Sequence, residues 1–363
     1  MEKWIERIPQ KVGKIITWGL LVFMCCNIMV SCMALVRYDE REKGIRAETR
    51  WEHWTDEHYD DAKMKKFIRM QRVSKKERRR KKMQDQKQQN HNQQKKIALI
   101  NDFTGFGRCS IAVQLPVISM MKVQCCAVPT AIFSDHTAYD SFYCTDYTAE
   151  MEPYIEEWKK LGLKFQGICT GFLGSEEQIR IVGEFIHTFK EKDTTVVVDP
   201  VMGDGGKRYA TYTEEMCRKM SEVVQYADIV VPNVTEACLL TGTQYKEEWS
   251  SGELERLAEQ IAGSGPAKVV ITGIEKKNHV ANLCYEKGAG YEMIQTEKIG
   301  SPRSGTGDIF AAIIAADAVN GTGLTESVRK ASGFIGKCIQ RSVELEIPLA
   351  DGICFEELLY LLK

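Results

Sequence analysis

The chain has 363 residues, a formal net charge of −1 and 44% hydrophobic residues, values that are ordinary for a globular protein. The total charge hides an asymmetry, because residues 1–96 hold 24 Lys/Arg against 13 Asp/Glu and the remainder holds 25 against 37. An acidic body argues against a nucleic-acid-binding core. The 13 cysteines include no CxxC pair and no Cys/His ligand spacing. We therefore interpret them as reduced, small hydrophobic residues of a cytosolic protein.

Residues 15–36 form a run of 22 residues without charge, which is long enough to cross a bilayer as a helix. A cleaved signal peptide is one alternative, but the run exceeds a usual signal core and shows no evident cleavage site. A reading frame extended upstream of the native start is another. Basic residues are denser after the run, which favours a cytoplasmic body by the positive-inside rule. We expect a transmembrane-like segment over 1–36 and membrane contact through 15–36.

Residues 63–96 carry 15 Lys/Arg and 2 Asp/Glu and include a Gln/Asn-rich tract. Such a composition is typical of a solvated linker, which we place over 37–94. Binding to anionic lipid or to nucleic acid is the alternative. The remaining residues, 95–363, are expected to form the folded domain.

Short apolar runs alternate with amphipathic segments throughout the body. Continuous apolar strands between helices predict an α/β fold whose central, mainly parallel sheet is covered on both faces. The expected strands are 96–100, 125–133, 165–170, 195–200, 228–232 and 268–272, with antiparallel pairs within 279–299. The expected helices are 110–121, 151–161, 175–190, 213–225, 234–240, 252–262, 305–320 and 325–344.

Polar residues follow each of these strands. In an open parallel sheet, ligands bind at the carboxyl ends of the strands, so we expect these residues to gather at one edge. They are Asn101-Asp102, 130–137, Thr170-Gly171, 199–204, 233–236 and Thr272-Gly273.

The glycine-rich turn Ser304-Gly305-Thr306-Gly307-Asp308 precedes a strongly apolar run. Its glycines allow a tight turn, and a helix that starts there would present free N–H groups and a partial positive charge to an anion. Asp308 would lie in the first turn of this helix. A capping carboxylate with no chemical role is the alternative.

Two common nucleotide-binding motifs fit poorly. Residues 105–110 match GxGxxS after the first strand, but no acidic residue follows where a dinucleotide ribose contact is needed. No GxxxxGK[ST] motif is present, because Gly206-Lys207 is followed by Arg208. The turn at 304–308 offers another way to hold phosphate.

The ordered motifs of the body resemble those of the ribokinase-like small-molecule kinases, and within them the pyridoxal/pyridoxamine kinases. The resemblance covers residues 95–363 and implies a three-layer α/β/α domain that is usually dimeric. The motifs that carry it are Asn101-Asp102 with the glycine turn to Ser110, 134–139 (SDHTAY), 170–172 (TGF), 199–204 (DPVMGD), 232–237 (PNVTEA), 270–273 (VITG) and 305–308 (GTGD).

The resemblance also implies roles for individual residues. Asp308 is expected to act as catalytic base on a substrate hydroxymethyl group, with the N–H groups of Gly305, Thr306 and Gly307 stabilising the transferring phosphoryl group. ATP and Mg²⁺ are the implied cosubstrate and cofactor. The remaining expectations are ATP contacts at Asp199, Asn233, Thr272, Tyr209 and Gly307, metal–phosphate contacts at Asp204 and Glu236, and substrate contacts at Asn101, Asp102, Thr137 and His136.

Each of these residues also has a purely structural interpretation. Asp199 can end a strand, Asn233 can cap a helix, and Thr272 can pack within the sheet. His136 can be a turn residue and Tyr209 a surface residue.

The substrate class is argued from the first turn. Many pyridoxal kinases carry a serine where this chain has Asn101-Asp102, whereas hydroxymethylpyrimidine kinases usually have a Gly-Gly-Ala-Gly turn there. The pattern favours pyridoxal, pyridoxine or pyridoxamine as acceptor over the pyrimidine. A hydroxymethylpyrimidine or sugar kinase is the alternative within the enzymes. A membrane-tethered, non-catalytic nucleotide-binding protein is the alternative outside them.

Overall fold

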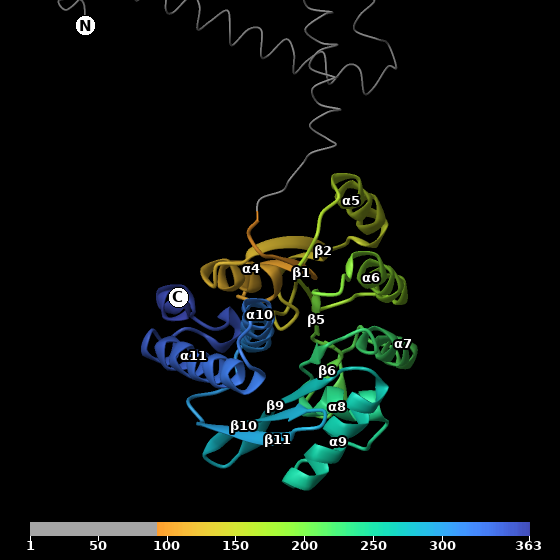
Figure 1. Ribbon diagram of the computed structural model, residues 1–363. Coiled ribbons are helices and arrows are strands. Elements are labelled where there is room, and N and C mark those ends of the chain that lie inside the picture. The colour runs from red at the N-terminus through yellow and green to blue at the C-terminus, as the bar shows by residue number, and fades with distance from the viewer. Residues whose placement is uncertain (1–92) are drawn as a thin grey trace, which may run out of the picture. The chain divides into compact units, whose positions relative to one another are not determined.

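The computed structural model describes residues 93–363 (Figure 1). The segment expected over 1–36 lies outside the described residues, as does all but the end of the expected linker. Within the described residues, nine strands form one sheet in the order β11-β10-β9-β8-β5-β4-β1-β2-β3. The six strands from β9 to β2 run parallel, and antiparallel strands lie at both edges. The mainly parallel α/β sheet is confirmed.

The element bounds are as follows. The strands of the sheet are β1 (Lys96–Phe106), β2 (Gln124–Asp135), β3 (Cys144–Asp146), β4 (Gly167–Thr170), β5 (Thr195–Val198), β8 (Ile229–Val230), β9 (Lys268–Lys276), β10 (His279–Glu286) and β11 (Gly290–Glu297), and a small hairpin pairs β6 (Gly203–Asp204) with β7 (Lys207–Arg208). The helices are α4 (Ser110–Met120), α5 (Thr148–Leu161), α6 (Glu176–Phe189), α7 (Glu214–Val224), α8 (Val234–Thr241), α9 (Ser251–Ser264), α10 (Thr306–Asn320), α11 (Leu324–Glu344) and the 3₁₀ turns η2 (Leu349–Asp351) and η3 (Glu356–Leu362).

Helices cover both faces of the sheet, as Figure 1 shows. Helices α5 to α9 lie on one face, and α4, α10 and α11 lie on the other. Successive side chains of β1 alternate between the two cores, because neighbouring residues of a strand point to opposite faces. Ala98 and Ile100 pack with α5 and α6, whereas Ile97 and Leu99 pack with α4 and α10.

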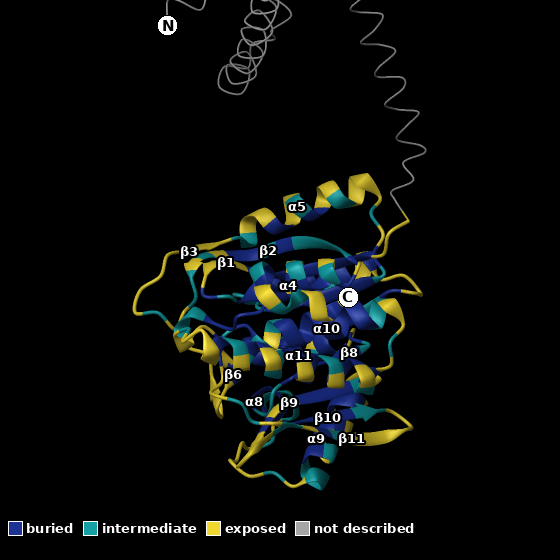
Figure 2. Cartoon of the chain, turned by 90° about the vertical axis from the view of Figure 1, so that its left-hand side faces the viewer, coloured by how far each residue is buried: buried dark blue, intermediate teal, exposed yellow. Residues whose placement is uncertain are grey.

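Helix α10 is buried along most of its length (Figure 2). Its residues 309–316 are all buried, so the helix has no amphipathic pattern and packs against α4, α11 and the sheet together. Gly305 before it and Gly321 after it both adopt left-handed backbone conformations, with φ of 86° and 89°. The expected glycine turn leading into a buried helix is confirmed.

Strand β1 is longer than the sequence indicates. It continues past Asn101 to Phe106 beside β2, with a register shift between Asn101 and Phe103. The extension escapes an apolar-run search because its buried residues, Asp102 and Thr104, are polar, whereas Phe103 and Phe106 are 43% and 55% exposed. Strand β3 and the β6–β7 hairpin are too short for a periodic pattern and were not anticipated.

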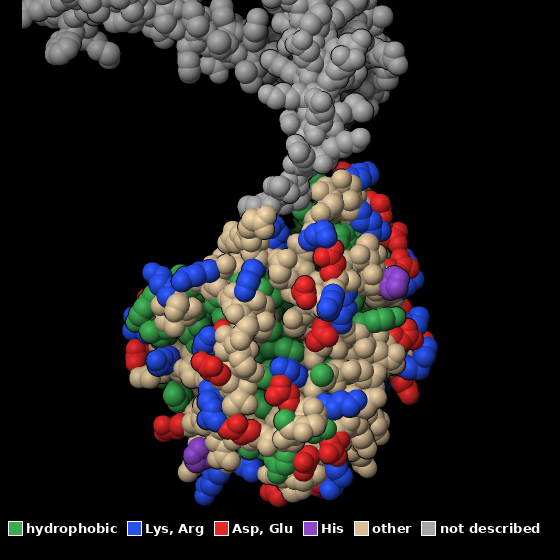
Figure 3. All heavy atoms as spheres, in the orientation of Figure 1, with side chains coloured by type: hydrophobic (Ala, Val, Ile, Leu, Met, Phe, Trp, Pro, Cys, Tyr) green, Lys and Arg blue, Asp and Glu red, His purple; other side chains and the backbone are tan. Residues whose placement is uncertain are grey.

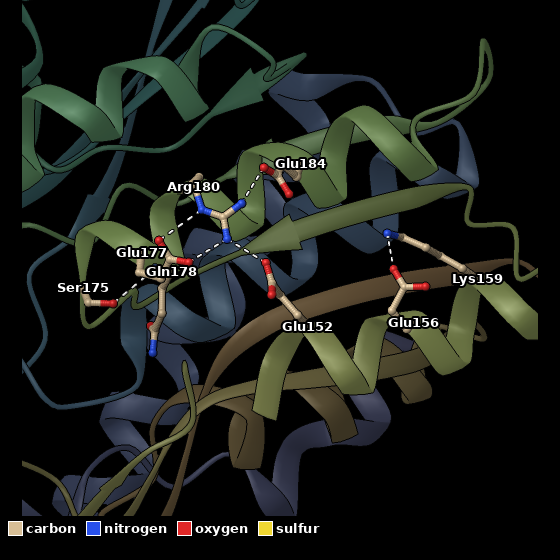
Figure 4. Close-up of polar contacts among 8 residues, drawn as sticks. All are labelled: Glu152, Glu156, Lys159, Ser175, Glu177, Gln178, Arg180 and Glu184. Atoms are coloured by element: carbon tan, nitrogen blue, oxygen red, sulfur yellow. Dashed lines mark hydrogen bonds and ion pairs between the residues drawn. The ribbon is translucent and has the colours of Figure 1, made fainter. Parts of the chain in front are cut away.

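Charged side chains of both signs lie on the surface of the domain (Figure 3). Arg180 of α6 bonds to Glu177 and Glu184 on its own helix and to Glu152 of α5, as Figure 4 shows. All four side chains are exposed, so this network contributes little to stability. Lys/Arg and Asp/Glu are interspersed over the face drawn in Figure 3. Among residues 93–363, none of the helices combines the length and the apolar character that crossing a bilayer requires.

Candidate active site

A cavity of about 1990 Å³ opens at the carboxyl edge of the parallel strands. The parallel arrangement brings there the second halves of β1 and β9 and the residues that follow β5 and β8, together with the first turn of α10. Every residue predicted for the site lines this cavity: Asn101, Asp102, His136, Thr137, Asp199, Asp204, Tyr209, Asn233, Glu236, Thr272, Gly305, Thr306, Gly307 and Asp308.

The N-terminus of α10 combines hydrogen-bond donors with a carboxylate. The first N–H groups of a helix have no partner within it, so Thr306 and Gly307 present donors where the helix dipole is positive. Asp308 lies in this first turn and lines the cavity. Burial raises the pKa of its carboxyl to about 6, and the charge of Asp102 adds to the shift, against hydrogen bonds from the Ser110 backbone and Asn101. A carboxylate with this pKa is a competent base near neutral pH.

Asn101 and Asp102 are both buried at the end of the regular part of β1. The Asn101 Nδ2 group donates to Asp308 Oδ1 over 3.2 Å. Asp102 Oδ2 accepts a 2.7 Å bond from the Thr104 hydroxyl, and burial raises the pKa of the Asp102 carboxyl. Both residues thus have protein partners at the floor of the cavity.

Three further carboxylates line the cavity near the ends of β5 and β8. Burial, followed by the charges of Glu236 and Asp308, raises the pKa of Asp199 well above its usual range. Glu236 accepts from the backbone N–H groups of Asn233 (2.8 Å) and Met202 (3.1 Å), and burial raises its pKa to about 8. Asp204 is exposed, and its Oδ1 accepts from the N–H of Gly205.

This set of carboxylates fits a Mg²⁺ ion that takes its remaining ligands from phosphate oxygens and water. No group of three or more His, Cys, Asp or Glu side chains among the described residues could hold a metal by itself. Mg²⁺ is ordinarily held by one or two carboxylates, waters and substrate phosphates, and a nearby cation would relieve the repulsion that raises the pKa of Asp199. Asp199 and Asp204 have the freer oxygens, whereas Glu236 uses both of its oxygens on backbone N–H groups.

Asn233 and Thr272 occupy neighbouring strand ends and form an isolated parallel bridge. Asn233 is the N-cap of α8: its Oδ1 accepts from Glu236 N and its Nδ2 donates to Gly203 O over 2.8 Å. Thr272 Oγ1 lies 3.4 Å from Pro232 O, and Tyr209 is 43% exposed at the rim. The structural interpretation of Asn233 as a cap therefore holds, with its backbone at the cavity wall.

His136 forms a hydrogen bond to the C-terminal part of the chain. Its Nδ1 accepts from Ala138 N, so Nε2 carries the proton and donates to Ala350 O over 2.5 Å. Tyr139 Oη donates to Asp351 Oδ1, and Arg108 Nη1 donates to Asp351 O. Both ring nitrogens of His136 are thus engaged by the protein, whereas Thr137 beside it is exposed at the cavity.

Two residues near the site were not anticipated. Gln114 is fully buried in α4, and its Oε1 accepts from Asn101 Nδ2 over 2.8 Å. Arg303 is 9% exposed and lines the cavity one residue before Ser304, with Nη1 donating to the carbonyls of Ile347 and Pro348. Gln114 had a detectable signal, because it is the one amide in the apolar helix SIAVQLPVISM, and a buried polar side chain needs a reason.

Unpaired N–H groups at the start of a helix beside a half-buried carboxylate, at the carboxyl edge of a parallel sheet, are what a small-molecule kinase of the α/β class needs to hold a phosphoryl group and to accept a proton. Residues 111–349 match the family model described as phosphomethylpyrimidine kinase. The chain belongs to this family, which places it in the ribokinase-like superfamily with the pyridoxal kinases.

Three similar proteins illustrate the range of the family. A solved structure from Bacteroides thetaiotaomicron, described as a putative phosphomethylpyrimidine kinase in a crystal form with pyridoxal, is 35% identical with a TM-score of 0.72, covering 74% of this chain and 96% of its own. The hydroxymethylpyrimidine/phosphomethylpyrimidine kinase of Aquifex aeolicus is 29% identical over 50% of this chain and 69% of its own. The pyridoxine kinase of Bacillus subtilis is 29% identical over 51% and 67%.

The two glycines at the start of α10, Gly305 and Gly307, should respond differently to an added methyl group. Gly305 has φ of 86°, and a Cβ there would lie 2.2 Å from the carbonyl oxygen of Arg108. We expect Gly305→Ala to lower the free energy of unfolding by about 1–3 kcal/mol or more. Gly307 has no atom within 4 Å of the added Cβ, so Gly307→Ala should leave the unfolding free energy unchanged or slightly higher.

Chemical denaturation of both variants measures this difference. Equal destabilisation by the two substitutions would contradict the packing of Gly305 against the Arg108 carbonyl.

Proposed function

We propose that the protein transfers the γ-phosphoryl group of ATP to the 5′-hydroxymethyl group of pyridoxal, pyridoxine or pyridoxamine. The observation that carries the proposal is the placement of Asp308 beside the free N–H groups of α10 in a cavity large enough for two substrates. The relative from Bacteroides thetaiotaomicron, whose crystal form contains pyridoxal, supports a vitamin B6 vitamer as the acceptor. A homodimer and membrane contact through residues 15–36 remain part of the proposal.

The chemistry needs a base and an anion site, and the chain supplies both. The Asp308 carboxylate accepts the proton of the hydroxymethyl group, whose oxygen forms a bond to the γ-phosphorus. The bond from that phosphorus to the β–γ bridging oxygen breaks, and its electron pair leaves with ADP. The N–H groups of the 305–307 turn donate to the oxygens of the transferring group, where negative charge is concentrated. Mg²⁺, held at Asp199 and Asp204, would neutralise the charge of the phosphates.

A hydroxymethylpyrimidine kinase is the second candidate, favoured by the description of the matched family and by the relative from Aquifex aeolicus. Both acceptors are flat heterocycles that carry a hydroxymethyl group, so the same base and anion site serve either. The walls of the acceptor end of the cavity decide between them.

A comparison of acceptors tests the proposal. With the full-length chain, ATP and Mg²⁺, kcat/KM for the best B6 vitamer should exceed that for hydroxymethylpyrimidine by about tenfold or more, and ribose should not be phosphorylated. The reverse order would support the second candidate. Binding of both substrates by calorimetry without turnover would instead indicate a non-catalytic nucleotide-binding protein.

Replacement of Asp308 separates chemistry from binding. Asp308→Asn keeps the shape of the side chain and removes the proton acceptor, so kcat should fall by about 10²–10⁴-fold. The dissociation constant of an ATP analogue, measured by calorimetry, should change little. Turnover at the wild-type rate would remove Asp308 from the mechanism.

The pH dependence of the reaction should show the same base. Because the pKa of Asp308 is raised to about 6 and the carboxyl must be ionised to accept a proton, activity should be present above pH 6 and lost below it. For a single ionisation, kcat/KM falls about tenfold per unit below that pKa. The residual activity of Asp308→Asn should lack this acid limb, the fall of kcat/KM below pH 6. Circular dichroism over the same pH range controls for unfolding. A limb centred near pH 4 in the wild type would contradict the assignment.

A further inference from the structure

We propose that Asn101 and Gln114 form a positioning pair that orients the Asp308 carboxylate, and that Asn101 acts through this base rather than on the substrate. The inference rests on the proposed function, because it explains how the Asp308 carboxylate is held in position to act as the base. It is carried by a chain of buried hydrogen bonds running from α4 through β1 to the first turn of α10.

The orientation of the Asn101 amide is determined by its surroundings. Its Oδ1 accepts from two backbone donors, Phe172 N at 2.7 Å and Asp102 N at 2.9 Å. Only the oxygen of an amide can accept from these groups, so the NH₂ group must lie on the opposite side. There it meets Gln114 Oε1 at 2.8 Å and Asp308 Oδ1 at 3.2 Å.

The two hydrogens of Nδ2 therefore have two acceptors. One hydrogen is directed to Gln114 and the other to Asp308, so the amide has no donor left for a ligand. Asn101 is 1% exposed, which agrees with a residue that contacts the base from behind. The structure thus assigns Asn101 a different position in the reaction from the substrate contact that the sequence suggests.

Gln114 provides an independent indication. It is fully buried, and its Nε2 meets no hydrogen-bond acceptor in the part of the chain that the structure describes. A buried, unpaired amide donor costs stability, by about 1–3 kcal/mol. A methionine of similar volume would avoid that cost, so a residue kept for packing alone would not need the amide. The Gln114 oxygen explains why the amide is present, because its hydrogen bond keeps the Asn101 NH₂ group oriented toward Asp308.

A neutral amide suits this position better than a cation. An Arg or Lys beside Asp308 would also hold the carboxylate, but its charge would lower the pKa of Asp308 and weaken the base. Asn101 restrains the carboxylate with one hydrogen bond and adds no charge. The charge of Asp102 on β1 adds to the raised pKa of Asp308, and the charge of Asp308 in turn adds to the raised pKa of Asp199 after β5.

The first experiment removes the donor. Asn101→Ala should lower kcat by about 10- to 100-fold, because small misplacement of a reacting group is costly, with a smaller change in acceptor KM. The acid limb of kcat/KM should also move to higher pH by about half a unit or more, because a bond to the ionised form is lost. A raised KM with an unmoved limb would show that Asn101 contacts the substrate and would overturn the proposal.

Asn282→Ala is the matched control. Asn282 is 6% exposed, accepts from Gly273 N and donates to Ser332 Oγ, so it is a buried asparagine with partners other than Asp308. Its loss should reduce stability and leave the acid limb in place. A shift of the limb in this variant as well would point to a general structural effect and count against the proposal.

The second experiment tests Gln114 through Asn101. Gln114→Met should lower kcat severalfold and leave the free energy of unfolding nearly unchanged, because one unpaired donor is removed while another is created on Asn101. In the Asn101→Ala background the same substitution should have no further effect on kcat. Gln178→Met is the control: Gln178 of α6 is equally buried but makes three satisfied bonds, so its loss should reduce stability without the kinetic change. Additive effects of Asn101→Ala and Gln114→Met would refute the pair.

A measurement without substrate separates this proposal from the proposed function. Carboxyl ¹³C NMR of aspartate-labelled full-length chain, with the Asp308 signal assigned by its loss in Asp308→Asn, follows the titration of Asp308 directly. Asn101→Ala should raise the observed pKa, and Asn282→Ala should not. If the wild type phosphorylates no acceptor, the proposed function fails while this shift still tests the bond. If the shift is absent in an active enzyme, the positioning pair fails alone.

Discussion

Burial of α10 on all sides is the constraint on which the site depends. Eight consecutive side chains, 309–316, are enclosed by α4, α11 and the sheet. Because this part of the helix is packed on all sides, it cannot rotate or slide without disturbing its neighbours. Gly305, immediately before the helix, has a left-handed backbone conformation and lies close to the Arg108 carbonyl. Apolar packing around α10 therefore determines the positions of its free N–H groups, of its dipole and of the Asp308 carboxylate.

The cavity concentrates negative charge and satisfies it with neutral donors. Glu236 accepts from two backbone N–H groups, Asp102 from a hydroxyl and Asp308 from an amide. Because neutral donors offset burial less than cations would, the pKa values of Asp199, Glu236 and Asp308 are all raised. A kinase site of this kind is electrostatically suited to a cation, and the pKa of about 6 suits Asp308 to the role of base proposed for it.

The loop that carries His136 is linked to the turn at 304–308 by the C-terminal segment 347–356. Ile353 N donates to Ser304 O in the turn, and Ala350 O accepts from His136 Nε2. Arg108, in the turn between β1 and α4, donates hydrogen bonds to the same segment, to the Asp351 carbonyl and to the Glu356 carboxylate. These loops are distant in sequence, and their relative positions depend on a part of the chain that carries none of the family motifs.

The sequence by itself determined the class of fold, the order of the main elements and the edge of the sheet at which the site lies. Buried parallel strands have a recognisable composition, and their carboxyl ends must meet at one edge. It also indicated the turn that opens α10 and the kinase family, because these depend on local residue types in order. Tertiary structure alone decided the extension of β1, which depends on pairing with β2. It also decided the distant partners of His136, Asn233 and Glu236, which are Ala350, Gly203 and Met202. The contact between Asn101 and Asp308 joins residues 207 positions apart, and such a bond depends on how β1 and α10 pack rather than on either sequence segment.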